Sequence, residues 1–151
     1  MDKKELKVVA LKNGTVIDHI PSDKLFKVVS ILELDKVPNL ITIGNNLESR
    51  KLGTKGIVKV SDLYFEEKTI NKIALIAPNA NLNLIKNYSV VEKKSVSLPD
   101  LITDIVACVN PNCITNKEQL ATKFHVINKE PIMLKCHYCE RIIEEERLKM
   151  K

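Results

Sequence analysis

The sequence predicts an α+β protein with a larger mixed N-terminal domain followed by a small β-rich domain. Three observations carry this prediction. Short β-rich runs alternate with two segments of helical periodicity as far as residue 91. A short polar stretch with a proline, 93–100, then interrupts the pattern. All four cysteines lie beyond it. We therefore expect one domain over residues 1–97 and a second over residues 98–151.

The composition is typical of a folded chain without a membrane span. Its 151 residues are 44% hydrophobic and 28% charged, which is enough apolar material to bury a core. No apolar run approaches the ~20 residues that a bilayer span needs. The first residues mix acids with lysines, unlike the continuous apolar stretch of an export signal. A cytoplasmic location is therefore expected, where paired cysteines more often hold a metal than each other.

The N-terminal domain is expected to begin with two strands and a helix. Residues 6–11 and 15–20 have the β-branched content of strands, and Asn13-Gly14 between them favours a tight turn. Pro21 and the Ser-Asp that follows it supply a stop and a helix cap. Apolar side chains then recur at helical spacing as far as about Asp35, which predicts an amphipathic helix.

A second set of elements completes the domain. Strands are expected at 40–43 and 56–60, with a polar loop between them. Residues 66–77 place Ile and Ala on one stripe and end at a proline, which predicts a helix. Runs at 81–85 and 88–91 supply the closing strands. The order strand, helix, strand, strand, helix, strand is the split βαβ pattern of a ferredoxin-like sheet with helices on one face.

The C-terminal domain is expected to be β-rich and to need a crosslink. Strand-like runs occur at 105–107, 123–127 and 132–134. The tail 144–149 carries acids first and bases last, which favours a short helix through the helix dipole. A domain of this size buries too little apolar surface to be comfortably stable without a metal or a disulfide.

The four cysteines are the sharpest chemical signal in the sequence. Cys108 and Cys113 form a C-x4-C pair, and Cys136 and Cys139 form a C-x2-C pair. Each pair spans a tight turn, so four sulfurs can converge at ~2.3 Å from one tetrahedral ion, and thiolates at this spacing select zinc. Two disulfides or four free thiols are the alternatives. Four thiolates leave no position for water, so the expected Zn²⁺, one per chain, is structural.

The three histidines give weaker signals. His137 lies between two expected ligands, but with four sulfurs available an exposed residue of the turn is the better interpretation. His125 alternates with apolar neighbours, which favours a polar residue on a strand face. His19 ends a strand beside Asp18, where it could meet a charged ligand, and an ordinary turn histidine explains it equally well.

Charge and missing motifs favour a binding protein. Residues 1–100 carry 16 basic and 12 acidic side chains, whereas residues 101–151 carry 8 and 7. A nucleic-acid-binding zinc ribbon would instead concentrate positive charge around the metal. The sequence has no nucleophile-base pair, no glycine-rich phosphate loop and no zinc-protease motif. Such a ribbon, and a metal-dependent enzyme with an open ligand position, are the rival hypotheses.

Several stretches together resemble the regulatory chain of aspartate carbamoyltransferase. They are GTVIDHIP at 14–21, ITIG at 41–44, Asn83 to Tyr88 with Val90 and Lys93, SLP at 97–99, and the four cysteines with LKCHYCE at 134–140. The resemblance implies a non-catalytic subunit of pyrimidine biosynthesis, whose N-terminal domain binds ATP, CTP or UTP and whose zinc domain contacts the catalytic chain. It also implies a regulatory-chain homodimer, and a holoenzyme of two catalytic trimers and three regulatory dimers.

The same resemblance implies a nucleotide pocket in the first domain. Matched by motif position, its residues are Val9, Ala10, Leu11, Val16, Asp18, His19, Lys55, Lys59, Asn83, Ile85, Tyr88, Val90 and Lys93. Main-chain groups read the base in the family, and Asp18 suits a carboxylate that accepts from ribose hydroxyls. Lys93 and His19, with the other two lysines nearby, would meet the triphosphate. The best-studied members carry a glutamate where this chain has Val9, so effector choice is expected to differ here.

Overall fold

The computed structural model describes residues 10–151, which divide between two compact units, Met1–Ser97 and Leu98–Lys151. The expected strand at 6–11 lies mostly outside the described residues, as does the expected pocket residue Val9. Ala10 and Leu11 are described, and they belong to no strand. Within 10–151, no helix has the length and apolar character needed to span a membrane.

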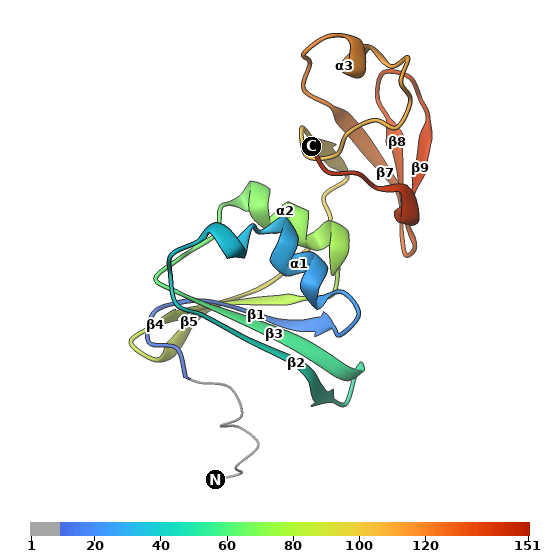
Figure 1. Ribbon diagram of the computed structural model, residues 1–151. Helices are drawn as coiled ribbons and strands as arrows, with labels where there is room; N and C mark the ends of the chain where they lie inside the picture. The colour runs from blue at the N-terminus through green and yellow to red at the C-terminus, as the bar shows by residue number, and fades with distance from the viewer. Residues whose placement is uncertain (1–9) are drawn as a thin grey trace. The chain divides into compact units, whose positions relative to one another are not determined.

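Unit 1 is built on a five-stranded antiparallel sheet with helices on one face (Figure 1). Its elements are β1 (Gly14–Pro21), α1 (Leu25–Ile31), η2 (Leu34–Lys36), β2 (Ile41–Ser49), β3 (Gly53–Ser61), α2 (Glu67–Ile76), β4 (Asn81–Lys86) and β5 (Ser89–Ser95). The strand order is β2-β3-β1-β4-β5, with every neighbouring pair antiparallel. This is the ferredoxin-like arrangement with β5 added beside β4, so the predicted fold class is confirmed.

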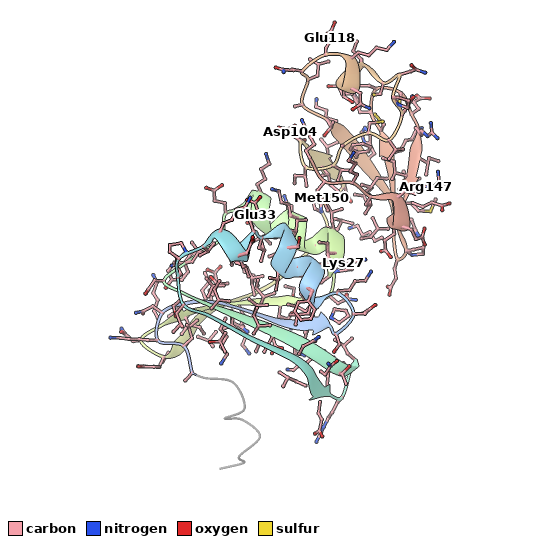
Figure 2. The ribbon with its side chains drawn as sticks, in the orientation of Figure 1. Lys27, Glu33, Asp104, Glu118, Arg147 and Met150 are labelled. Carbon is pink, nitrogen blue, oxygen red and sulfur yellow. The ribbon has the colours of Figure 1, made fainter. Side chains whose placement is uncertain are left out.

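The sheet of unit 1 has a covered face and an open face. Ile17 of β1 is fully buried and pairs with Val58 of β3 on one side and Leu82 of β4 on the other. These side chains form the sheet side of the core, beneath α1 and α2. Lys27 of α1 is also on the helical side of the sheet (Figure 2). Because side chains alternate along a strand, Val16 belongs to the opposite, open face.

A β-bulge interrupts β1 and places two polar residues next to each other. Ile17 pairs with Val58, but Ile20 pairs with Gly56, so β1 has one extra residue over this stretch. Ile17 and Ile20 are both fully buried. The extra residue is accommodated at His19, whose φ is +60°. Asp18 and His19, both half-buried, therefore lie together between two core positions.

Two segments of unit 1 differ from the sequence expectation. The first helix ends at Ile31 rather than near residue 35, because Glu33 adopts a left-handed conformation with φ +52° and a separate 3-10 turn follows. The polar loop expected between the second and third strands is a hairpin, in which pairing continues to Ser49 and Gly53 and leaves residues 50–52 as the turn. Cross-strand hydrogen bonds extend these strands although the polar composition disfavours them.

Unit 2 is the predicted small β-rich domain. Its elements are β6 (Leu101–Thr103), α3 (Ile114–Lys117), β7 (Lys123–Lys129), β8 (Ile132–Cys136), β9 (Ile142–Glu144) and η3 (Glu145–Arg147). The strands form one antiparallel sheet in the order β6-β7-β8-β9. Phe124, Ile132, Leu134 and Ile143 are fully buried and form its core.

Three boundaries in this part of the chain also differ. Residues 105–107 were expected to form a strand, but Val106 makes only an isolated bridge to Met150, and the strand lies at β6 instead. The expected helix at 144–149 is a short 3-10 turn at Glu145–Arg147, because Glu144 still belongs to β9 and pairs with Met133. Lys93, placed in the expected linker, belongs to β5.

Gly14 supports a stability prediction because its position has no room for a side chain. Its φ is +139°, and a Cβ would lie 2.1 Å from the carbonyl oxygen of Val60. Gly53 also has positive φ, +79°, but a Cβ there would meet nothing within 4 Å. We expect Gly14→Ala to lower the free energy of unfolding by about 3 kcal/mol or more, and Gly53→Ala by about 1 kcal/mol. Urea denaturation of both variants would test this, and equal losses would refute the steric explanation.

Candidate metal centre and ligand-binding face

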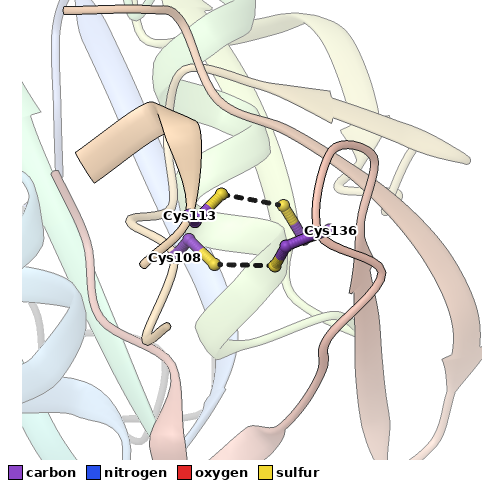
Figure 3. A group of neighbouring side chains, drawn as sticks. Cys108, Cys113 and Cys136 are labelled. Carbon is purple, nitrogen blue, oxygen red and sulfur yellow. Dashed lines mark hydrogen bonds between the residues drawn. The ribbon is translucent and has the colours of Figure 1, made fainter. Parts of the chain in front are cut away.

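The four cysteines converge in unit 2, where all their sulfurs lie within 4.8 Å of one another. The Sγ atoms of Cys108 and Cys139 are 3.6 Å apart, and those of Cys113 and Cys136 are 3.8 Å apart (Figure 3). Ligands ~2.3 Å from a tetrahedral zinc lie about 3.8 Å from each other, so both distances match edges of that tetrahedron. A disulfide would require about 2.05 Å. The donor set therefore fits one structural zinc ion.

The first cysteine pair is held by a hydrogen-bonded loop. The side-chain amide of Asn116 donates to the carbonyl oxygens of Cys108 at 2.9 Å and Asn110 at 2.7 Å. The backbone N–H of Cys113 donates to the same Asn110 carbonyl at 3.0 Å. Cys113 then precedes α3, and the Thr115 hydroxyl lies 3.2 Å from its sulfur. These bonds fold the C-x4-C segment so that both sulfurs point to one side.

The second pair sits at the end of β8. Cys136 pairs with Phe124 of β7, and its N–H donates to the Arg141 carbonyl at 2.9 Å. Its own carbonyl accepts from the N–H of Glu140 at 3.0 Å, and Glu140 has φ +65°. The N–H of His137 donates to the carbonyl of Lys123 in β7 at 2.8 Å. The turn is thus fastened to the core strand beside it.

Burial keeps protons on part of this cluster when no cation is bound. It raises the pKa of the Cys108 thiol to about 12 and also raises the pKa of Cys136. Burial by itself would also raise the pKa of Cys139. Hydrogen bonds from the Arg141 backbone and the Asn110 side chain outweigh that effect and lower the pKa to about 7. Zinc binds thiolates, so the cation replaces these protons and supplies the charge that the buried sulfurs lack.

A second group of expected site residues forms a row across the open face of unit 1. Val16 of β1 pairs with Lys59 of β3 and with Asn83 of β4, and Asn83 pairs with Lys93 of β5. Partners directly opposite in an antiparallel sheet project from the same face. The row therefore has a lysine at each end, and the apolar Val16 and the amide of Asn83 lie between the two lysines.

The bulge in β1 adds a polar network to this face. The Lys55 ammonium lies 3.0 Å and 3.2 Å from the two carboxylate oxygens of Asp18. The backbone N–H of His19 donates to the carboxylate of Asp18 at 2.7 Å. The ring Nδ1 of His19 lies 3.3 Å from the side-chain amide nitrogen of Asn81. Burial lowers the pKa of Lys59, and the negative charge of Asp18 opposes that effect. The network brings an acid, an imidazole and two lysines near each other.

A cavity of ≈ 500 Å³ opens beside His19. It is lined by His19, Lys51, Leu52, Pro78, Asn79, Asn81, Ser95 and Val96. Asn81 and Ser95 were missed by sequence reasoning, although the strand register places Asn81 directly opposite Asp18. Lys51 lies next to Arg50 in the β2–β3 turn, and the sequence does not show which way its side chain points.

The remaining pocket residues lie around the β4–β5 turn. Ile85 is buried, Val90 pairs with it, and Tyr88 is 67% exposed at the tip of the turn. The Tyr88 N–H donates to the Lys12 carbonyl at 2.9 Å, so the segment that includes Ala10 and Leu11 leads to this turn. The Ile85 carbonyl, expected to help read a base, accepts a hydrogen bond from the Tyr64 hydroxyl at 2.9 Å.

Known proteins match the chain along nearly its whole length. The family described as aspartate carbamoyltransferase regulatory chain, allosteric domain, matches residues 6–97, and the one described as its metal binding domain matches residues 100–149. The chain is 58% identical over 149 residues to the aspartate carbamoyltransferase regulatory chain of Parabacteroides distasonis, which covers 99% of this chain and 97% of the relative. It is 54% identical over 146 residues to the regulatory chain of Pyrococcus abyssi, a match that covers 95% of this chain and 96% of the relative.

The thiol chemistry predicts how zinc affinity depends on pH. Because buried thiols must lose protons to bind zinc, we expect the affinity of the metal-free chain to rise steeply between about pH 6 and pH 8. The rise should exceed tenfold per pH unit, since more than one proton is released. Competition with a chromogenic chelator at several pH values measures it. Calorimetry in two buffers of different ionisation enthalpy counts the protons, and zinc binding without proton release would contradict the prediction.

Proposed function

Since the chain belongs to the aspartate carbamoyltransferase regulatory chain family, we propose that it binds nucleoside triphosphates on unit 1 and passes their effect to a catalytic chain through unit 2. The chain is a regulatory subunit with an allosteric and a metal-binding domain, not an enzyme. The proposal assigns nucleotide binding to residues 1–97 and zinc binding with catalytic-chain contact to residues 98–151.

The observation that carries the nucleotide proposal is the row of paired residues on the open face of unit 1. Lys59 and Lys93 stand at its two ends, with Val16 between them, and the bulge network lies beside it. A cation ~4 Å from a phosphate is worth on the order of 1 to 4 kcal/mol, depending on screening. Several such cations on one face suffice to hold a triphosphate without a glycine-rich loop.

The roles of the other pocket residues follow from their chemistry. Asp18 suits ribose hydroxyls, because a carboxylate only accepts hydrogen bonds. Its ion pair with Lys55 orients the carboxylate. The apolar side chains of Ile85 and Val90 and the exposed ring of Tyr88 suit a base. ATP, CTP and UTP share the triphosphate and ribose, so all three are proposed ligands of this face.

Unit 2 is proposed to be the docking platform for the catalytic chain. The four sulfurs tie the loop 109–112 to the turn 137–140, and zinc bound there would fix both segments. Tyr138 and Ile114 next to these segments are 42% and 40% exposed. Exposed apolar side chains on a rigid turn are suited to a protein interface.

The assembly and its location complete the proposal. Pairs of regulatory chains would join through unit 1, and three such dimers would link two catalytic trimers. A thiolate zinc site stays reduced in the cytoplasm, which suits an enzyme of pyrimidine biosynthesis there. A tenfold change in the apparent affinity of the catalytic chain for its substrate needs ~1.4 kcal/mol of coupling, which differential contacts of a few lysines can supply.

Lys93→Ala tests the nucleotide face. We expect it to weaken CTP binding by about tenfold, since it removes one of the cations that faces the triphosphate. Lys27→Ala makes the same change of charge on α1, on the helical side of the sheet (Figure 2), and should leave CTP binding unchanged. Equilibrium dialysis measures both, with zinc content as a check on unit 2. Equal affinities for the two variants would contradict the assignment of Lys93.

Cys113→Ala tests the docking platform. We expect zinc content to fall from one ion per chain to nearly none and assembly with the catalytic chain to be lost, while CTP binding persists. Thr115→Ala is a matched control, because it removes the hydroxyl next to the Cys113 sulfur but keeps four thiolates. Size-exclusion chromatography with the catalytic chain reads out assembly. A Cys113 variant that assembles as well as the Thr115 variant would refute the platform.

A further inference from the structure

Two histidines meet in unit 2 outside the sulfur cluster. The Nε2 atom of His125 and the Nδ1 atom of His137 are 3.0 Å apart, and the ring centroids are separated by 5.2 Å with planes inclined by 39°. Both side chains are exposed. His137 belongs to the turn 137–140 of the proposed docking platform, but neither imidazole has a role in the zinc site or the nucleotide face, so the proposed function assigns no chemistry to the pair.

The backbone holds this pair in place from both sides. His125 lies within β7, and His137 lies in the turn that follows β8. His125 pairs with Lys135, so His137, two residues further along, is the diagonal neighbour of His125 on the same face, within reach of a ring side chain. The N–H of His137 also donates to the Lys123 carbonyl. The folded sheet therefore fixes the backbone positions from which the two imidazoles meet.

The observed distance also suits two ligands of one metal ion. Imidazole nitrogens bind such ions at ~2.0–2.1 Å, so two ligands at a right angle are about 2.9 Å apart. In the structure, these two nitrogens share one hydrogen bond between the rings. That bond contributes little at an exposed site, because water competes for both partners. A rotation of two exposed side chains turns both lone pairs toward one ion without moving the strands.

We propose that His125 and His137 form a second metal site that takes an exchangeable divalent transition ion such as Ni²⁺ or Cu²⁺. Imidazole is a suitable ligand for both ions. Among residues 10–151, the sulfur cluster is the only group of three or more His, Cys, Asp or Glu donors, so water completes the shell here. Lys135 is the cross-strand partner of His125, and its positive charge repels a bound cation. The site therefore binds metal more weakly than the sulfur site.

Nickel titration of the full-length, zinc-loaded chain tests this site. Ni²⁺ is the probe for two reasons. The four thiolates prefer zinc to nickel, and Ni²⁺ does not oxidise thiolates. We expect one Ni²⁺ per chain by calorimetry, and His125→Ala and His137→Ala should each weaken its binding by about tenfold or more. His19→Ala removes the third imidazole, which lies in unit 1, and should leave nickel binding unchanged.

Two further measurements make the outcome decisive. Paramagnetic Ni²⁺ should broaden the NMR signals of the His125 and His137 rings and spare those of His19, while zinc stays at one per chain. The proposal is wrong if the wild-type chain and both variants bind nickel alike, or if nickel uptake follows zinc loss. It is also wrong if broadening falls on His19 alone. None of these results depends on nucleotide binding or on the catalytic chain.

Discussion

Strand register is the constraint on which both candidate sites depend. β1 pairs with β3 on one side and β4 on the other, so the positions of residues 14–17 are each set twice. This double pairing puts Ile17 in the core and Val16 on the open face, between Lys59 and Asn83. One inserted residue at the bulge changes the alternation locally and adds Asp18 and His19 to the site. A one-residue slip of β1 would exchange core residues with those of the candidate site, so the register determines both the fold and that site.

The same constraint operates in unit 2, where the strands are shorter and the core is small. The register of β7 and β8 sets Cys136 opposite the fully buried Phe124, so the second sulfur pair starts from the core of the domain. The first pair comes from a loop without strand structure, held by the amide of Asn116. Joining a core strand to a loop through four sulfurs is how a domain of this size compensates for the apolar surface that it cannot bury.

Much of the fold could be predicted from the sequence because periodicity and turn chemistry are local properties. The order of elements in unit 1 and the sulfur set needed only spacing, so both were found. The extension of β2 to Ser49 was missed, because cross-strand partners stabilise it against its own polar composition. The strand β9 was missed because three residues are too short a run to show a period. The pairing of Asn81 with Asp18 and the meeting of His125 with His137 depend on register between distant segments. Intrinsic propensity contains no such information.

The two units obtain their stability from different sources, and this determines how one can influence the other. Zinc stabilises only the state that holds four thiolates together, so its free energy belongs to the folding of unit 2. A nucleotide bound on the open face, as proposed, would add its binding free energy to unit 1. Neither contribution by itself changes a catalytic chain, since a ligand shifts an equilibrium only by its difference in affinity between two states. In the proposed function that difference would have to arise in the assembly, where lysines such as Lys93 would face the triphosphate differently in two quaternary arrangements. The proposed nucleotide face could therefore tolerate modest affinity, because regulation would depend on the change in its contacts rather than on their sum.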